Sequence, residues 1–303
     1  MQLSEYYGFL KRFGLIFTLK EIYYRFYTNI LDKHVSYKRD RDTLKYLKRY
    51  LNKNSAYSLN ERPIKKINPC IWTCWLQGYD NAPPIVKACI NSMQKYSNGY
   101  DVIIITEENL SDYVSMPDFI TKKYKADIIS ATQFSDLLRT LLLINYGGIW
   151  LDATVLLTKK IPQILLDSDF FVFQSSILHN EYQPCSSWFI IAKKNNPVLL
   201  KIFEIHASYW KDNSILINYF LFHVTVQLVI TYDNEAKQLW QKIFYKNDSE
   251  PHYLQKKLFD KFEPIMKDYI WDMSFAHKLT YKFNNASLPE LPETYYKHII
   301  GTV

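Results

Sequence analysis

Alternating strand-like and helix-like segments predict an α/β fold with a mostly parallel sheet flanked by helices. Residues 102–106 form a β-branched run that is typical of a buried strand. Apolar residues within 134–142 recur at the spacing of an amphipathic helix, which stops near Gly147 and Gly148. A short apolar run follows at once and ends at Asp152. This alternation favours parallel strands, and ligands bind beyond the carboxyl ends of such strands.

The same patterns continue through most of the chain. The longest apolar stretch lies in a predicted helix over residues 214–230. Polar Asn218, His223 and Gln227 interrupt it, so we expect a core helix rather than a membrane span. Further strands and helices are predicted at residues 71–76, 85–95, 170–174, 188–192 and 197–210.

The N-terminal part has a different character and is predicted to be a helical appendage. Residues 1–66 contain 15 Lys or Arg and 6 Asp or Glu, whereas the net charge of the whole chain is +7. A polar stretch with two prolines separates this part from the rest, and we place the boundary between segments 1–62 and 63–303. The basic charge and the aromatic residues fit either an anionic membrane surface or helices that simply pack against the main domain.

Composition excludes several classes of protein. Hydrophobic residues make up 48% of the chain, which argues against extensive disorder. The four cysteines fit neither a zinc site nor a disulfide framework, and we expect Cys70 and Cys74 to be buried thiols in a reducing compartment. The N-terminus lacks the pattern of a signal peptide. We therefore expect a cytoplasmic protein, peripheral at the inner face of the cell membrane if the basic helices bind lipid.

The residues that bear chemistry fall in two adjoining motifs. Asp136 and Arg139 are three residues apart on the predicted helix and share one of its faces. Asp152 then follows the Gly-Gly pair and a short strand, with Thr154 two residues later. A carboxylate at a strand end, close to a hydroxyl, can hold a divalent cation or the ribose of a nucleotide. Taken alone, however, Asp136 and Arg139 would be read as an ordinary helix-surface ion pair.

Residues 134–155 resemble the donor-site signature of glycosyltransferase family 32, and most of all its bacterial capsular polysaccharide synthesis branch. The resemblance covers roughly residues 71–282, and its outer matches are less specific than the central one. It implies a GT-A fold, which is Rossmann-like, and a nucleotide-sugar donor that favours UDP. It also implies transfer of a hexose or N-acetylhexosamine with retention of anomeric configuration. Weaker matches lie at residues 71–78, 82–86, 188–190 and 277–280.

Carried onto this sequence, the resemblance implies a donor site built from both motifs. Trp72 would stack on the uracil ring, and Asp136 with Arg139 would bind the donor sugar and steady the diphosphate. Ser135 would cap or support that helix face, and Asp152 would correspond to the first acid of an Asp-x-Asp motif. The remaining donor-binding residues would be Gln77, Gly147, Gly148, His277 and Lys278.

The motif departs from the family pattern at Thr154, where an Asp-x-Asp motif has its second acid. A neutral hydroxyl is a weaker ligand than a carboxylate. We expect Mn²⁺ or Mg²⁺ to be held by Asp152, Thr154 and His277, with help from phosphates and water. The alternative is that Lys278 supplies the positive charge in place of a metal.

The acceptor side is less well defined. Trp188 and His223 are candidate acceptor-binding residues, although core packing would explain each of them equally well. The acceptor we expect is a saccharide or a lipid-linked oligosaccharide of a surface polysaccharide. Two other functions compete with transfer. The first is a non-catalytic carbohydrate-binding or assembly protein on a transferase scaffold, and the second is nucleic-acid binding, which the absence of a recognised module disfavours.

Overall fold

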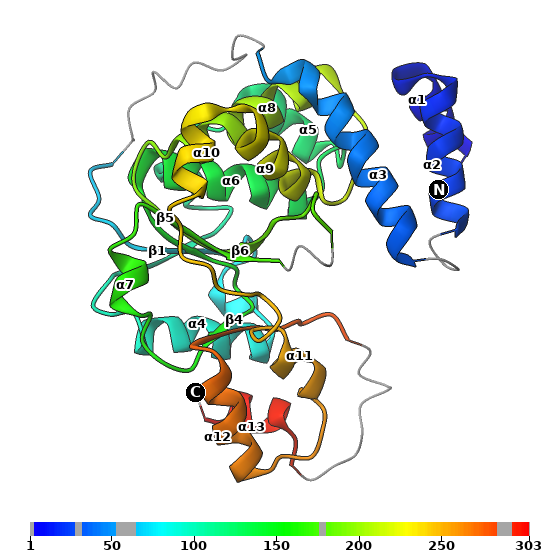
Figure 1. The fold of residues 1–303 in the computed structure, drawn as a ribbon. Helices are drawn as coiled ribbons and strands as arrows, with labels where there is room; N and C mark the ends of the chain where they lie inside the picture. Colours follow the sequence, from blue (N-terminus) through cyan, green and yellow to red (C-terminus); the bar gives the residue numbers. More distant parts are fainter. Residues whose placement is uncertain (1–2, 28–31, 53–64, 176–179, 284–292, 303) are drawn as a thin grey trace.

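A five-stranded sheet with the order β2-β1-β3-β6-β5 lies at the centre of the molecule (Figure 1). The structure is a computed structural model that describes residues 3–27, 32–52, 65–175, 180–283 and 293–302. Strands β1 to β3 are parallel, and β6 runs antiparallel to both of its neighbours, so four of the five strands share one direction. This confirms the predicted α/β fold with a mostly parallel sheet. The strands are β1 (Ile71–Cys74), β2 (Val102–Ile105), β3 (Gly148–Leu151), β5 (Phe170–Gln174) and β6 (Cys185–Ala192).

Helices cover both faces of the sheet (Figure 1). One face carries the largest apolar cluster, which joins the sheet to the long helix α6 and to α8 and α9. The other face packs against α4 and a second, two-stranded sheet. The helices of these layers are α4 (Pro84–Lys95), α5 (Asp118–Lys125), α6 (Ala131–Tyr146), α7 (Gln163–Leu166), α8 (Pro197–Asp212), α9 (Leu221–Tyr232) and α10 (Asn234–Trp240). Three short 3₁₀ helices are η1 (Lys48–Tyr50), η2 (Tyr79–Asn81) and η3 (Leu110–Asp112).

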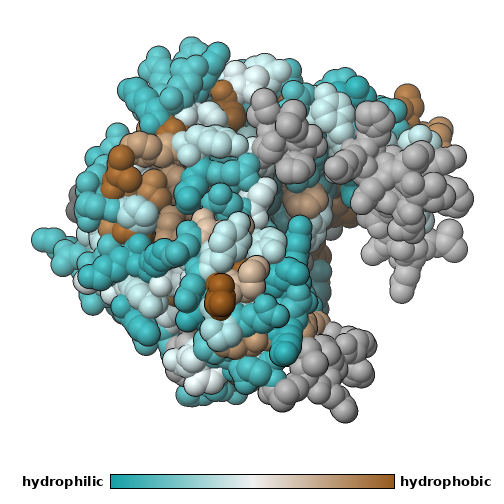
Figure 2. All heavy atoms as spheres, turned by 60° about the horizontal axis from the view of Figure 1, so that its bottom comes forward, coloured by the Kyte–Doolittle hydropathy of each residue, from teal (hydrophilic) through white to brown (hydrophobic). Residues whose placement is uncertain are grey.

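The C-terminal part crosses back to the centre of the chain. Strand β7 (Ala276–Lys278) pairs with β4 (Val155–Leu157), which directly follows the motif at Asp152. The surface at this end of the molecule is mainly hydrophilic, with hydrophobic residues in small patches (Figure 2). The three C-terminal helices are α11 (Tyr253–Lys257), α12 (Pro264–Met273) and α13 (Tyr295–Gly301).

The predicted N-terminal helices are present as α1 (Leu3–Phe13), α2 (Leu15–Tyr27) and α3 (Asp32–Leu47). Helix α3 lies beside α9, and α1 and α2 stand at the outer edge of the molecule (Figure 1). Buried Asp40 of α3 accepts a hydrogen bond from the Asn218 side chain at 2.6 Å, which ties α3 to the main body. The predicted boundary between residues 62 and 63 lies outside the described residues.

The apolar stretch 214–230 is helical only from Leu221 onward. Asn218 explains the later start, because its side-chain oxygen accepts the backbone N–H of Phe220 and forms a turn there. Most of α9 is buried, as expected for a core helix. None of the helices in the described ranges has both the length and the apolar character that crossing a membrane requires.

Candidate functional site

A cleft of about 450 Å³ opens at the carboxyl ends of β1 and β3, beside the first turns of α6. This is where a mostly parallel sheet is expected to bind ligands. A second hollow at the ends of β1 and β2 shares Leu76 and Gln77 with it, so the two adjoin. The polar and aromatic residues that line the cleft are Trp75, Gln77, Thr132, Phe134, Ser135, Arg139, Trp150, Asp152, Thr154, Tyr219, Lys278, Tyr281 and Lys282.

Asp152 lies at the centre of the polar contacts. One oxygen, Oδ1, accepts the Trp150 indole N–H at 2.9 Å and lies 3.4 Å from the Arg139 guanidinium. The other, Oδ2, accepts a hydrogen bond from the Lys278 ammonium at 2.8 Å. Asp152 follows β3 directly, and its backbone N–H is bound by the Trp188 carbonyl on β6. The carboxylate is therefore positioned by the carboxyl end of β3, a central strand, and by two cations from other elements.

Arg139 is 4% exposed, although it lines the cleft. Its Nη1 donates to the Ser187 carbonyl at 2.6 Å, and its Nη2 donates to the Ser135 hydroxyl at 3.2 Å. The same Nη2 lies 3.4 Å from the Asp136 carboxylate. The guanidinium thus has two acidic neighbours and a fixed orientation, which a buried cation requires.

The two acids of this cluster have opposite pKa shifts. Burial, partly offset by Arg139, raises the pKa of Asp136 to about 6. Burial also acts to raise the pKa of Asp152, but the Lys278 and Arg139 cations outweigh it and hold that pKa below its ordinary value. Asp152 is therefore a stable anion and a poor proton acceptor, whereas Asp136 titrates within the range in which enzymes work.

The ammonium of Lys278 contacts Asp152 and Thr154, which are two of the predicted metal ligands. Its ammonium donates to both Asp152 Oδ2 and Thr154 Oγ1, the latter at 2.7 Å. It reaches them because the pairing of β7 with β4 sets Lys278 opposite Val155. In the part of the chain that the structure describes, no three His, Cys, Asp or Glu side chains gather into a possible metal site. The carboxylate and the hydroxyl predicted to hold a metal thus both accept hydrogen bonds from the Lys278 ammonium.

The predicted metal-ligand and donor-binding roles of His277 are contradicted by its position. Neighbouring residues of a strand point to opposite faces, so Lys278 faces the cleft and His277 faces away from it. The His277 ring is fully buried beside Trp271, and burial lowers its pKa to about 4.

The predicted base-stacking role of Trp72 is also wrong for this structure. Trp72 is fully buried under α6, packs against Tyr113 and Tyr146, and donates its indole N–H to the Gly147 carbonyl at 3.0 Å. Three residues later, beyond the end of β1, Trp75 lines the cleft, and its ring lies 5.1 Å from that of Tyr281. Trp72 and Trp75 both belong to the match at residues 71–78. Trp72 lies within β1 and is buried, whereas Trp75 follows the strand and lines the cleft.

Gly147 and Gly148 allow a tight backbone turn, and they lie away from the cleft. Both have positive φ, at 71° and 99°. A Cβ on Gly148 would lie 2.4 Å from the Cys70 carbonyl oxygen, and one on Gly147 would lie 2.7 Å from the Lys194 nitrogen. Gly148 begins β3 and Asp152 follows its last residue, so the glycines sit at the opposite end of the strand. Their predicted contact with a donor is therefore contradicted.

Ser135 and Gln77 both line the cleft, and their donor-binding roles stay predictions. The Ser135 carbonyl and hydroxyl both accept hydrogen bonds from Arg139, so this residue supports the guanidinium. The helix itself is capped by Ser130, whose side chain accepts the Gln133 backbone N–H. Gln77 is exposed in the loop after β1.

The two predicted acceptor residues lie in different places. Trp188 is contradicted as an acceptor contact, since it is 5% exposed and stacks on Phe173 with ring centroids 4.7 Å apart. His223 is half-buried on α9 near the cluster, and burial, with a further contribution from Arg139, lowers its pKa to about 4. Its role stays a prediction. Tyr219, at 59% exposure, also lines the cleft.

The cleft combines a fixed anion, three cations and several aromatic rings. Two cations beside one fixed carboxylate leave positive charge for an anionic ligand. Aromatic rings such as Trp75 and Tyr219 offer faces for a base or a sugar. Sequence reasoning missed Trp75, Tyr281 and Lys282 as lining residues. Trp75 lies within the match at residues 71–78, whereas Tyr281 and Lys282 come just after the match at residues 277–280.

Known proteins resemble this chain at the level of sequence and family. The model of the capsular polysaccharide synthesis protein family matches residues 23–299. The O-glycosyltransferase braB of Annulohypoxylon truncatum is 26% identical over 156 residues, which are 46% of this chain and 37% of that protein. The chain thus spans little more than a third of that relative. A solved structure named PaToxG Glycosyltransferase is 18% identical and aligns with 69% of this chain and 86% of its own, at a TM-score of 0.38. Because the family model covers most of the chain, this protein belongs to the capsular polysaccharide synthesis protein family.

Proposed function

We propose that this protein transfers a hexose or N-acetylhexosamine from a nucleotide sugar, with UDP favoured, to a saccharide acceptor in capsular or other surface polysaccharide synthesis. One observation carries the proposal: Arg139 and Lys278 converge on Asp152 in a cleft at the carboxyl ends of β1 and β3. Membership of the family and the name of the relative braB support glycosyl transfer. Parallel strands that end at this acidic motif support the GT-A arrangement.

The chemistry requires positive charge at the leaving group. As the bond from the anomeric carbon to the diphosphate oxygen breaks, negative charge develops on the diphosphate. Lys278 and Arg139 are the cations that line the cleft beside Asp152. In this proposal they neutralise the leaving diphosphate, so transfer proceeds without a divalent cation. The sequence leaves open whether a metal or Lys278 supplies the positive charge. The contact between the Lys278 ammonium and Thr154 favours Lys278.

The fixed ionisation of Asp152 bears on the stereochemical outcome. A base for the acceptor hydroxyl has to take up a proton, and Asp152 holds its charge too firmly for that. In a retaining transfer, the acceptor oxygen bonds to the anomeric carbon while its proton passes to the leaving phosphate oxygen. No enzyme base is needed in such a step. The lowered pKa therefore disfavours Asp152 as the base of an inverting transfer, and retention stays part of the proposal on the family resemblance.

Substitution of Lys278 tests the proposal against a matched control. Lys278→Gln removes the cation beside Asp152, and we expect a loss of transfer of at least about a hundredfold. Lys159→Gln removes a lysine that pairs with Asp272 at 2.5 Å just beyond the other end of β4, on the open surface. We expect that control to keep full activity. The readout is release of the nucleoside diphosphate and formation of the sugar product, each measured with and without a chelator.

The competing function is a non-catalytic carbohydrate-binding scaffold. It predicts that the wild-type chain binds a sugar ligand but never releases nucleoside diphosphate. Wild-type turnover that Lys278→Gln leaves unchanged would instead contradict the assignment of the cation. Transfer that a chelator abolishes would restore the metal expected from the sequence.

A further inference from the structure

The outward face of α2 is apolar. Its exposed large residues are 40–75% accessible and recur at the spacing of a single helix face. The opposite side packs inward through Thr18, Glu21 and Tyr24, which are buried. Helix α1 adds exposed Tyr7 and Leu10. The pair of helices α1 and α2 thus carries apolar residues on its outward side as well as on the side that packs inward through Phe9, Phe13 and Phe17, whereas an ordinary surface helix keeps its apolar side toward the core. The exposed residues of α2 are Leu15, Ile16, Leu19, Ile22 and Tyr23.

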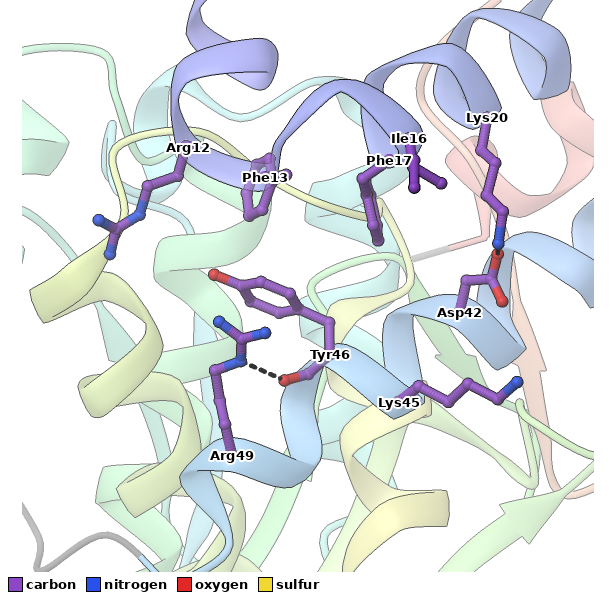
Figure 3. Close-up of a pocket in the computed structure, with 9 residues that line it drawn as sticks. All are labelled: Arg12, Phe13, Ile16, Phe17, Lys20, Asp42, Lys45, Tyr46 and Arg49. Atoms are coloured by element: carbon purple, nitrogen blue, oxygen red, sulfur yellow. Dashed lines mark hydrogen bonds and ion pairs between the residues drawn. The ribbon is translucent and has the colours of Figure 1, made fainter.

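A groove of about 390 Å³ runs between this helical pair and α3 (Figure 3). Aromatic rings of Phe13, Phe17 and Tyr46 line it, and four cations project around them. Ile16, on the apolar face of α2, also lines the groove, so the two features are continuous. The cations are Arg12, Lys20, Lys45 and Arg49, and the acid is Asp42.

Most of the positive charge of the groove is uncompensated. Lys20 pairs with Asp42 at 2.7 Å. Arg12 donates instead to the neutral Asn213 side chain, and Arg49 donates to the Tyr46 carbonyl and stacks 3.9 Å from the Tyr46 ring. Among the described residues, no carboxylate lies within ion-pair distance of Arg12, Lys45 or Arg49. The groove therefore presents three cations beside an exposed apolar face.

We infer that this surface docks the protein on an anionic lipid membrane, with a phosphate-bearing lipid head group in the groove. The apolar face of α2 would lie at the boundary of the acyl chains, as amphipathic interfacial helices do. Cations beside that face match the negative charge of the head groups. A second copy of the chain fits less well, because a two-fold contact would set this face against itself and bring like charges together.

The docking surface is separate from the transfer site. No residue of the groove lines the cleft at Asp152, so lipid binding does not depend on the proposed transfer chemistry. The element also extends beyond the region shared with the family, whose match begins at residue 23, within α2.

Co-sedimentation of the purified full chain with lipid vesicles tests the inference. We expect the wild type to bind vesicles that contain phosphatidylglycerol in phosphatidylcholine much more strongly than pure phosphatidylcholine vesicles, and to lose affinity as salt rises. Ile16→Asn with Leu19→Asn should weaken binding at least tenfold. Lys45→Gln with Arg49→Gln should weaken it about fivefold per charge.

A matched pair of apolar substitutions on other surfaces provides the control. Ile164 of α7 and Ile265 of α12 are 56% and 86% exposed, and asparagine at both should leave vesicle binding unchanged. Thermal unfolding confirms that each variant is folded. Equal binding by wild type and the α2 variant would overturn the inference, as would a wild type without preference for anionic vesicles. A solution dimer that Ile16→Asn with Leu19→Asn dissociates, without change in vesicle binding, would assign the face to self-association instead.

Discussion

At the scale of single residues, the site depends on how charge is placed around Asp152. Two cations and an indole N–H hold its carboxylate, so it remains ionised although it is only partly exposed. Asp136, which lies behind Arg139, is buried and has no such surplus of cations. The two carboxyl groups of this cluster therefore differ in protonation. Asp152 stays ionised, whereas the pKa of Asp136 is raised to about 6. This division is typical of functional sites, where environment and not residue type sets the pKa.

Asp136 should give the transfer reaction an acidic limb. Its pKa is raised to about 6 by burial, so the carboxylate beside Arg139 becomes neutral below that pH. We expect the wild-type rate to fall as the pH drops through about 6, and Asp136→Asn to be slower but flat in this range. The pH profile of the transfer rate checks this. A wild-type profile that is flat near that pH would contradict the role of Asp136.

Asp136→Asn should slow the transfer reaction but raise the folding stability of the protein. Because folding raises the pKa of Asp136, the folded state holds that proton more tightly than the unfolded chain. Its stabilising contribution is complete at acid pH and is lost as the pH rises from about 4 to about 6. Asp136→Asn removes the cost of a buried carboxylate. We expect it to be about 1–3 kcal/mol more stable than the wild type near neutral pH, as measured by urea unfolding.

The sequence identified the charged centre better than the aromatic contacts. Helical spacing placed Asp136 and Arg139 on one face and a strand end placed Asp152, whereas their assignment to a donor site came from the family resemblance. Trp72 and Trp75 differ only in where β1 stops and which way its side chains point, and strand boundaries are the least certain part of such a prediction. Lys278 is 126 residues away from Asp152, so its contact depends on a strand pairing that no local pattern specifies.

At the scale of elements, the turn from α6 into β3 sets the position of Asp152. Gly147 and Gly148 let the chain reverse with positive φ while Cys70 of the neighbouring strand segment passes at close range. The sequence predicted a helix stop and two permissive glycines correctly. The family resemblance assigned both glycines to donor binding, whereas the atoms that they approach closely belong to the backbone. A pattern of glycines reveals the freedom of the backbone and not what comes near it.

Gly148→Ala should destabilise the protein much more than a glycine substitution in open space. The added Cβ would meet the Cys70 carbonyl oxygen at 2.4 Å, and neither backbone can move without disturbing the β1–β3 pairing. We expect a loss of at least about 1–3 kcal/mol of folding stability. Gly99→Ala is the matched control, because Gly99 also has positive φ but has nothing within 4 Å of the added carbon. Equal losses in urea unfolding would contradict the steric explanation.

At the scale of the whole molecule, the two proposed binding surfaces lie in different parts of the chain. The cleft is lined by residues of α6, of β7 and of the loops after β1 and β3, whereas the groove is lined by residues of the three N-terminal helices and η1. Composition predicts a distinct basic N-terminal part, since the basic charge is concentrated in residues 1–66. The alternation of elements likewise predicted the α/β fold. It could not give the strand order or the return of β7 to β4, because both depend on tertiary packing.

The measurement that tests the central claim most directly is thermal-shift screening of the full chain with UDP-, GDP-, CMP- and dTDP-linked sugars. Each donor is tested with Mn²⁺, with Mg²⁺ and with EDTA. Ligand that binds only the folded state raises its stability by about 2.7 kcal/mol at a hundredfold excess over Kd. We predict a rise of several degrees for one nucleotide class, UDP first, that persists in EDTA and disappears in Lys278→Gln. The absence of a shift with every donor would contradict a nucleotide-sugar site in this cleft.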